Sequence, residues 1–145
     1  MELMLLPLQV RWSDLDPNFH LRHSVYYDWG AFCRIEFLNS RGLTWKRMHE
    51  LQTGPIIFRE ECIFRREIRL DDPVTIDMKL LKAKRDFSKF TIQHEIKKNP
   101  ETVAAILTVD IAWMNGVTRK LTTLPQEDID KLAQTPLTAN FEWLD

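Results

Sequence analysis

Two carboxylates and two imidazoles lie within ten residues near the start of this 145-residue chain, at Asp14, Asp16, His20 and His23. A carboxylate can act as a nucleophile or as a general base for water, and histidine can relay a proton near neutral pH. Asp14 and Asp16 follow an expected strand, so their side chains face one side if the strand geometry persists. Asp is also frequent in plain turns, and this second interpretation stays open.

A metal site is another interpretation of these four side chains. They are acceptable ligand types for zinc or iron. Their spacing matches no familiar ligand motif, however, and the turn that carries His20 and His23 does not force them to converge. A catalytic, substrate-orienting or purely structural role is favoured instead, and we expect neither a metal nor a cofactor.

Residues outside this cluster are candidates for contacts to a substrate. Gly54-Pro55 precedes an expected strand, and its bare backbone can present an amide to a developing oxyanion, although a turn is the commoner explanation of such a glycine. Two basic clusters either suit the phosphates of a nucleotide such as coenzyme A or form solvated turns. They consist of Lys82, Lys84, Arg85, Ser88 and Lys89 at an expected hairpin, and of Arg65, Arg66 and Arg69.

The elements that position these residues can be read from apolar periodicity. Ser24 is the expected N-cap of a long apolar helix that ends near Gly42, with apolar residues at spacings of three and four. Period-two alternation predicts a strand at 8–12. The remaining expected elements are β-rich segments near 56–69, 74–83, 88–97 and 102–115, and short helices within 43–53 and 126–134.

This order predicts an α+β fold in which a curved antiparallel sheet of about five strands wraps one buried helix. The length predicts a single domain over residues 1–145. Such a sheet leaves a strand edge that needs covering, so we expect a homo-oligomer.

The composition narrows the classes of partner. The formal net charge is -1, which gives no broad field for nucleic acid or an anionic membrane. Cys33 and Cys62 lack metal-type spacing and are expected to be reduced core thiols. The apolar start, residues 1–6, is too short for a signal sequence or a membrane span. These features predict a cytoplasmic protein.

The run from Val10 to Tyr26 resembles the N-terminal motif of the 4-hydroxybenzoyl-CoA thioesterase family, which comprises hotdog-fold acyl-CoA thioesterases. That motif reads Asp-x-Asp, a small-residue turn, a His or Asn position, and an aromatic residue that opens the central helix. The segment 54–57 resembles the start of the family's second strand, and 88–93 resembles its Ser-x-x-x-x-Gln strand.

The resemblance implies roles for individual residues. Asp16 falls on the family's catalytic carboxylate, and His23 falls where a subset of the family has an active-site histidine. Tyr26 falls on the aromatic position that follows, and Gly54 falls where some members offer a backbone amide to the thioester carbonyl. His20 matches the histidine of a related Gly-His-Val-Asn-Asn variant.

One departure concerns the pocket. Phe19 stands where the family usually has glycine, which implies a reshaped or shortened acyl pocket and makes Phe19 a candidate substrate contact, as are His20 and the basic hairpin. The resemblance also implies dimers or tetramers with active sites between subunits, and no metal.

Two functions follow as hypotheses. The first is hydrolysis of an acyl-CoA or acyl-carrier-protein thioester, with Asp16 as nucleophile or general base and the amide near Gly54 as oxyanion donor. The second is a non-catalytic hotdog protein that binds acyl-CoA or a protein partner, for which Phe19 is the motivation.

Overall fold

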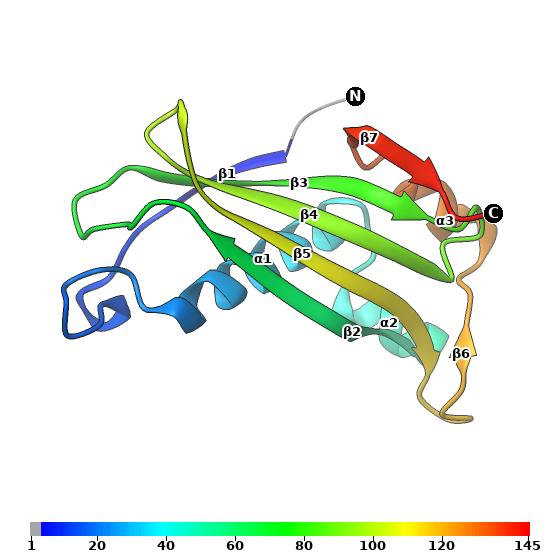
Figure 1. The fold of residues 1–145 in the computed structure, drawn as a ribbon. Helices are drawn as coiled ribbons and strands as arrows, with labels where there is room; N and C mark the ends of the chain where they lie inside the picture. The colour runs from blue at the N-terminus through cyan, green and yellow to red at the C-terminus, as the bar shows by residue number, and fades with distance from the viewer. Residues whose placement is uncertain (1–3) are drawn as a thin grey trace.

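One curved sheet and one long helix dominate the molecule, whose computed structural model describes residues 4–145 (Figure 1). Residues 1–3, part of the apolar start considered above, lie outside the described residues. The elements are β1 (Met4–Leu8), a 3-10 turn η1 (Trp12–Asp14), α1 (His23–Ser40), α2 (Trp45–Leu51), β2 (Thr53–Phe64), β3 (Val74–Ala83), β4 (Lys89–Lys98), β5 (Thr102–Asn115), β6 (Leu121–Thr122), α3 (Gln126–Leu132) and β7 (Leu137–Trp143).

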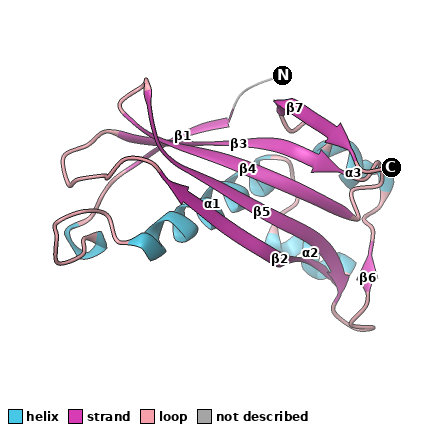
Figure 2. Ribbon diagram, viewed as in Figure 1, coloured by secondary structure: helices cyan, strands magenta, loops and turns pink. Residues whose placement is uncertain are grey.

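The described residues form a seven-stranded sheet in the order β1-β3-β4-β5-β2, with β6 added to β5 and β7 added to β3. All pairings are antiparallel except that of β7 with β3, which is parallel. Helix α1 crosses one face of the sheet, as Figure 2 shows. The predicted α+β hotdog fold is confirmed, with seven strands in place of about five.

The core lies between α1 and the sheet and is built by the two periodicities that the sequence shows. Every second residue of β4 from Phe90 to Ile96 is buried, and so is the matching series on β5 from Ala105 to Trp113. Gly30 permits the helix to approach closely, because a Cβ at that position would overlap the side chain of Leu107 on β5. The apolar helix therefore rests directly on the middle of the sheet.

The predicted beginning of α1 was wrong by a few residues. The helix begins at His23, after Arg22 in an extended conformation, and Ser24 lies inside its first turn. The hydroxyl of Ser24 accepts a hydrogen bond from Nε of Arg22 at 2.9 Å, so it does not cap the helix.

The predicted strand at 8–12 was also wrong, because β1 occupies Met4–Leu8 and pairs with β3. Pro7 is tolerated there because β1 is an edge strand. Beyond β1 the backbone N–H of Arg11 donates to the carboxylate of Asp14, and the N–H of Asp14 donates to the carbonyl of Arg11. These local bonds fold residues 11–14 into a 3-10 turn. A strand at this position would instead need hydrogen-bond partners on a neighbouring strand.

The strand predicted at 56–69 spans Thr53–Phe64 instead. It ends where the N–H groups of Arg65 and Arg66 both donate to the carbonyl of Ala104, which breaks the one-to-one pairing. β3 and β5 have the predicted bounds. β6 and β7 were not predicted.

Candidate active site

Asp16 lies in a tight turn between β1 and α1. Its backbone N–H donates to the carbonyl of His20 at 2.8 Å, and its own carbonyl accepts from the N–H of Phe19 at 2.9 Å. Its Oδ1 accepts from the N–H groups of Asn18 at 2.8 Å and His20 at 3.2 Å. Asp16 thus builds the turn, as the structural interpretation expected, and the same bonds hold its carboxylate in one orientation.

Asp14 does not share the position of Asp16. Its side chain is buried and pairs with Arg11, with Oδ1 2.9 Å from Nη2. The hydrogen bond from Arg11 holds the pKa of Asp14 below its ordinary value, against the effect of burial. The expectation that the two carboxylates face one side was wrong, because the strand that would align them ends at Leu8.

An open cleft of about 370 Å³ lies between this turn and the end of β2, and four predicted site residues border it. Three of them are Asp16, His20 and His23. Nε2 of His20 lies 3.0 Å from Oε2 of Glu67. The fourth is Tyr26, and the rest of the lining is Leu21, Phe64, Arg65, Arg66 and Glu67.

Tyr26 forms the floor of this cleft. Its side chain is buried and meets the ring of Phe64 edge-on, with centroids 4.9 Å apart. Burial raises the pKa of Tyr26 to about 12, and nearby Cys62 and Asp16 add to the shift. The phenol therefore keeps its proton at neutral pH and is a hydrogen-bond donor.

Arg65 and Arg66 give the rim of the cleft a positive charge. Both side chains are exposed, and Nη1 of Arg66 donates to the carbonyl of Arg65 at 2.9 Å. Of the two basic clusters considered from sequence, this one therefore shares a cleft with Asp16.

Gly54 lies at the opposite end of β2 from this cleft. About ten residues of strand separate it from Phe64, a distance of roughly 30 Å. It lines a separate hollow beside α2 with Trp45 and His49. Within one chain, the amide of Gly54 therefore cannot reach a carbonyl that contacts Asp16.

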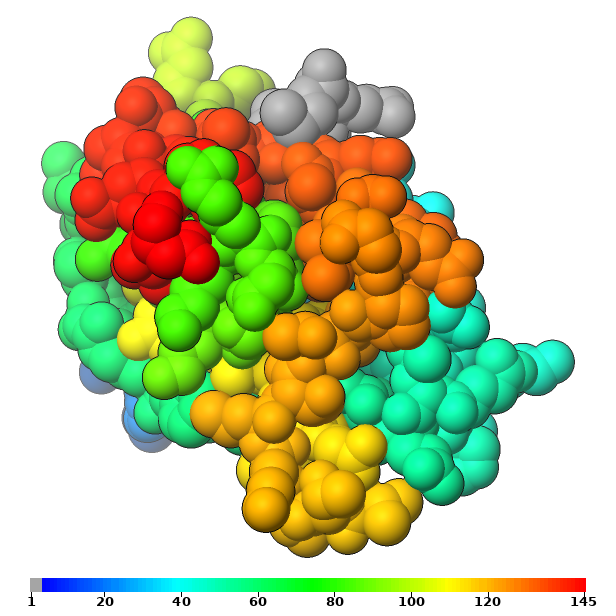
Figure 3. Space-filling model, turned by 90° about the vertical axis from the view of Figure 1, so that its right-hand side faces the viewer, coloured from blue at the N-terminus to red at the C-terminus, as the bar shows by residue number. Residues whose placement is uncertain are grey.

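The basic hairpin between β3 and β4 is also distant from Asp16. Arg85 lies over the ring of Trp143 at 4.8 Å, and its N–H donates to Oδ1 of Asp145. Figure 3 shows this hairpin (green) against β7 (red). Lys89 lies over the ring of Phe58 at 5.9 Å, and the hairpin's remaining predicted residues are Lys84 and Ser88.

Phe19 does not line the cleft. Its side chain is 65% exposed and lies 6.4 Å from the ring of Trp12. Its φ is 63°, in the left-handed region that favours glycine. The preference for glycine at this position is thus explained by the backbone conformation of the turn. The ring of Phe19 does not fill the cleft that Asp16 borders in this chain.

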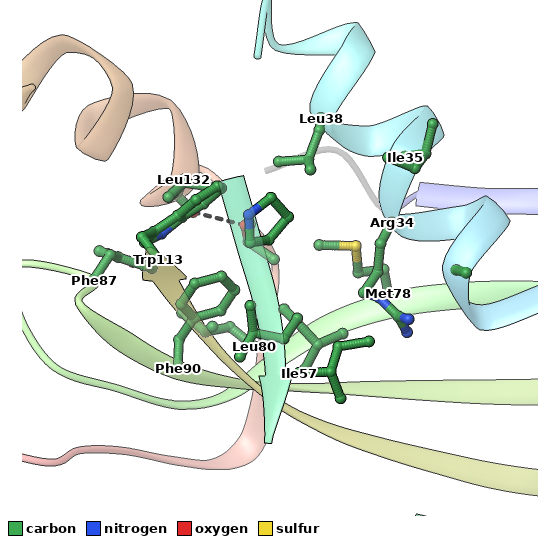
Figure 4. Close-up of a pocket in the computed structure, with 15 residues that line it drawn as sticks. Arg34, Ile35, Leu38, Ile57, Met78, Leu80, Phe87, Phe90, Trp113 and Leu132 are labelled. Carbon is green, nitrogen blue, oxygen red and sulfur yellow. Dashed lines mark hydrogen bonds between the residues drawn. The ribbon is translucent and has the colours of Figure 1, made fainter. Parts of the chain in front are cut away.

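Sequence reasoning missed an apolar cavity of about 190 Å³ between α1 and the sheet (Figure 4). No motif marks it. The one available signal is that Ala31, Ile35 and Leu38 follow the helical period on a face of α1 that the core does not fully cover.

A buried polar cluster beside this cavity was also missed. The ring of His94 is fully buried, with Nδ1 2.8 Å from the carbonyl of Asp77 and Nε2 3.0 Å from Nη1 of Arg34. A carbonyl only accepts and a guanidinium only donates, so Nδ1 carries the proton and Nε2 accepts. Burial and, as the second cause, the charge of Arg34 lower the pKa of His94 to about 3.

Among residues 4–145, no group of three or more His, Cys, Asp or Glu side chains is arranged to hold a metal ion. In the same part of the chain, none of the helices combines the length and apolar character needed to span a membrane.

Comparison with known proteins gives relatives of the same fold. The chain is 23% identical over 124 residues to a protein of Aquifex aeolicus that carries the name of an assumed esterase, covering 86% of this chain and 93% of that one. A hypothetical protein of Staphylococcus aureus, solved in complex with CoA, superimposes with a TM-score of 0.88 at 19% identity, over 97% of this chain and 90% of that one. The 1,4-dihydroxy-2-naphthoyl-CoA thioesterase of Synechocystis superimposes with a TM-score of 0.80 at 14% identity, over 92% and 97%.

The family assignment follows from a match along most of the sequence. The model of the thioesterase-like superfamily matches residues 10–134, which include the Asp16 turn, α1 and the strands from β2 to β5. This chain belongs to the thioesterase-like superfamily.

Proposed function

We propose that this protein hydrolyses acyl thioesters of coenzyme A, with Asp16 as the general base. The observation that carries the proposal is the cleft at the start of α1, where Asp16, His23 and Tyr26 meet. Membership of the superfamily supports thioester hydrolysis as the class of reaction. The CoA complex of the staphylococcal relative supports CoA as the carrier, with acyl-carrier protein as the alternative.

The orientation of the Asp16 carboxylate suits a general base. Oδ1 accepts two backbone hydrogen bonds, and no hydrogen bond within residues 4–145 engages Oδ2. A water molecule bound to Oδ2 transfers its proton there as its oxygen attacks the thioester carbonyl carbon. The C–S bond then breaks and the acid is released, while the proton held by Asp16 passes through His23 to the thiolate, which leaves as the free thiol and restores the Asp16 carboxylate.

The developing oxyanion needs donors in addition to Asp16. The protonated phenol of Tyr26 is one candidate, because its pKa of about 12 keeps the proton in place. The backbone amide near Gly54 is the second candidate, and it must come from another subunit because it lies at the far end of β2 in the same chain.

A two-fold dimer through β2 would supply that amide. Within the described residues β2 pairs with β5 alone, so its other edge lacks a partner strand. An antiparallel pairing of two β2 strands about the midpoint of Thr53–Phe64 places residue 54 of one chain opposite residue 63 of the other. Gly54 of the partner subunit then lies beside the Asp16 cleft.

The surface around this edge favours such a dimer. Large apolar side chains are exposed there, which is a liability for a single chain and is removed by pairing. They are Phe32 and Ile35 on α1, and Ile57, Phe58, Ile63 and Phe64 on β2.

The same pairing brings the basic hairpin of the partner subunit to the end of the sheet where Asp16 lies. Lys89 is level with Ala112 of β5, which in turn is level with Ile56, near the beginning of β2. Arg65 and Arg66 of one chain and the hairpin of the other would then supply positive charge for the phosphates of CoA.

The setting follows from the same reasoning. We propose that residues 1–145 act as one domain in the cytoplasm. Cys33 and Cys62 are both free thiols, which suits a reducing compartment.

The test is a free-thiol release assay over short, long and aromatic acyl-CoAs. Asp16→Asn should lower kcat by about 10²-fold or more. Asparagine keeps an oxygen that accepts from Asn18 and His20, so the turn is preserved. Asp28→Asn, at an exposed carboxylate on α1, is the matched control and should keep wild-type turnover.

Wild-type turnover in Asp16→Asn would refute the role of Asp16. Absence of thiol release from every substrate, with the protein folded and stabilised by acyl-CoA, would favour the non-catalytic binding protein. A single turnover in ¹⁸O-water can reveal direct attack, because ¹⁸O enters the Asp16 carboxylate only when water opens a mixed anhydride at the carboxyl carbon of Asp16, and general-base catalysis forms no such anhydride.

A further inference from the structure

The residues that follow β2 form the wall of the cleft that faces the Asp16 turn, residues 16–20. The N–H of Leu21, directly after that turn, donates to the carbonyl of Ile68 at 2.7 Å, and both residues are buried. Figure 1 shows the two segments side by side at one end of the sheet. Glu67 precedes Ile68 and borders the cleft, so its carboxylate is held beside the turn.

The Asp16 turn is held by bonds within itself. The N–H of Asp16 donates to the carbonyl of His20, and the N–H of Phe19 donates to the carbonyl of Asp16. Oδ1 of Asp16 accepts from the N–H groups of Asn18 and His20. Phe19 adds strain to this turn, because its φ of 63° lies in the left-handed region. The position of Asp16 therefore depends on whatever contact ties the turn to the rest of the protein.

An ion pair between His20 and Glu67 supplies such a contact. Nε2 of His20 lies 3.0 Å from Oε2 of Glu67. Within residues 4–145, it is the one hydrogen bond or ion pair that joins a residue of the turn to another segment. A carboxylate only accepts, so Nε2 carries a proton whether the imidazole is neutral or charged.

Glu67 is charged at neutral pH. Its Oε1 lies 2.7 Å from Nη2 of Arg69. Arg69 and, to a lesser extent, the charge of His20 hold the pKa of Glu67 below its ordinary value. Glu67 is therefore a lasting anionic partner for the imidazole.

The backbone of His20 connects this ion pair to the carboxylate of Asp16. Its N–H donates to Oδ1 of Asp16 at 3.2 Å, and its carbonyl accepts from the N–H of Asp16 at 2.8 Å. A shift of His20 therefore moves both partners of Asp16. Oδ2, the atom proposed to bind the attacking water, belongs to the same carboxyl group and changes direction with it.

The exposure of the pair favours an effect on rate over an effect on stability. The side chains of His20 and Glu67 are 33% and 41% exposed. Ion pairs with this exposure contribute little to the free energy of unfolding. A displacement of a reacting group by about 1 Å, in contrast, can lower a rate by about 10²-fold.

We propose that Glu67 is a positioning residue for thioester hydrolysis, which acts through the imidazole of His20 to hold the Asp16 carboxylate in the orientation that binds the attacking water. This inference rests on the proposed function. Glu67 itself contacts neither the water nor the thioester in this role.

A kinetic experiment separates positioning from binding. In the free-thiol release assay, Glu67→Ala should lower kcat about tenfold without raising KM. Glu67→Gln keeps an oxygen that accepts from Nε2 of His20 and should recover most of this loss. Glu101→Ala, at an exposed carboxylate in the turn between β4 and β5, is the matched control and should keep wild-type kcat. The urea midpoint of Glu67→Ala should stay close to that of wild type.

A double-mutant cycle tests the route through the imidazole. His20→Asn keeps the peptide groups that bond to Asp16, but its side chain is too short to reach Glu67. If Glu67 acts through His20, Glu67→Ala should lower kcat about tenfold in wild type and leave it unchanged in the His20→Asn background.

A spectroscopic experiment tests the link without any reaction. The backbone N–H of Asn18 donates to Oδ1 of Asp16 at 2.8 Å, so its signal in a ¹⁵N–¹H spectrum reports the position of the carboxylate. Glu67→Ala should shift this signal, and Glu101→Ala should not. The signal should return toward its wild-type position in Glu67→Gln.

The outcomes separate the two proposals. Wild-type kcat in Glu67→Ala, a raised KM with unchanged kcat, an equal loss in Glu67→Gln, or the same loss in the His20→Asn background would each overturn the positioning role and leave the proposed function intact. An unshifted Asn18 signal would overturn the link with or without hydrolysis. A shifted signal without hydrolysis of any thioester would refute the proposed function, while the link from Glu67 to the Asp16 carboxylate would stand.

Discussion

Lowering the pH from 7.5 to 4.5 should destabilise the fold through one buried imidazole, that of His94. Its Nε2 accepts a hydrogen bond from Arg34, so a proton added there would bring two cations together at 3.0 Å. The pKa of His94 is about 3 in the folded protein, against an ordinary value of 6.5. Between these two values the unfolded chain binds a proton that the folded protein does not, so the free energy of unfolding falls as the pH falls.

The size of this effect follows from the two pKa values. Relative to pH 7.5, the unfolded state gains about 1 kcal/mol at pH 5.5 and about 3 kcal/mol at pH 4.5. Carboxylates with a lowered pKa, such as Asp14 and Glu67, stabilise the folded protein until the pH falls to their ordinary pKa values or below. Burial raises the pKa of Asp77, so the folded protein binds a proton there before the unfolded chain does. This titration raises the free energy of unfolding as the pH falls toward the ordinary range of carboxylates.

Urea unfolding followed by tryptophan fluorescence, at pH 7.5, 6.5, 5.5 and 4.5, measures the effect. His94→Gln removes the titrating group while its amide can still donate to the carbonyl of Asp77 and accept from Arg34, so the variant should lose most of the slope. Because Asp77 titrates in both proteins, the difference between the two curves isolates His94. His49→Gln, at an exposed histidine on α2, should keep the wild-type slope.

Equal slopes for wild type and His94→Gln would refute the reasoning. A wild-type free energy of unfolding that stays constant from pH 7.5 to 5.5 would refute it too, because the calculated change exceeds the usual error of such measurements.

Two further predictions concern the backbone. Gly30→Ala should lower the free energy of unfolding by about 1–3 kcal/mol, because the new Cβ overlaps Leu107. This cost exceeds the gain of about 1 kcal/mol in helix propensity. Urea unfolding measures the change, with the exposed Asn39→Ala as the control. Phe19→Gly should change stability by less than about 1 kcal/mol, since relief of the left-handed φ of 63° offsets the larger entropy of the unfolded chain; unfolding and thiol-release assays check that both stability and turnover persist.

Each of these has a clear contrary result. Wild-type stability in Gly30→Ala would mean that the helix can move off the sheet at little cost. A tenfold loss of turnover in Phe19→Gly would mean that the ring contacts the substrate after all, although it lies outside the cleft in one chain.

The fold was largely predictable because turn residues in the sequence mark the ends of several of its strands. Turn residues before Val74 and after Lys98 bracket β3 and β4, and period-two alternation runs between them. The parallel pairing of β7 with β3 was not predictable, because it joins segments more than fifty residues apart without a local signal.

The site was predictable where its residues are close in sequence. Asp16, His20, His23 and Tyr26 border one cleft because a single turn and the first helical turn carry them. Gly54 was assigned to the same site by resemblance, and sequence spacing does not reveal that β2 carries it to the other end of the molecule. Trp113 belongs to an ordinary alternating strand, and only the packing of α3 and α1 makes it the wall of a cavity.

The pairing along β3 also determines how far the molecule can assemble through its sheet. β1 pairs with residues 74–78 of β3, and β7 pairs with β3 between residues 80 and 83, so the edge opposite β2 is divided between two short strands. In the language of polymer chemistry, the sheet has unequal ends, because β2 is its one long reactive end among the described residues and the opposite end consists of the short strands β1 and β7. We expect two such units to join through their long ends, so that further strand-to-strand growth has only the short β1 and β7 edges left and a larger assembly uses the faces of the sheet.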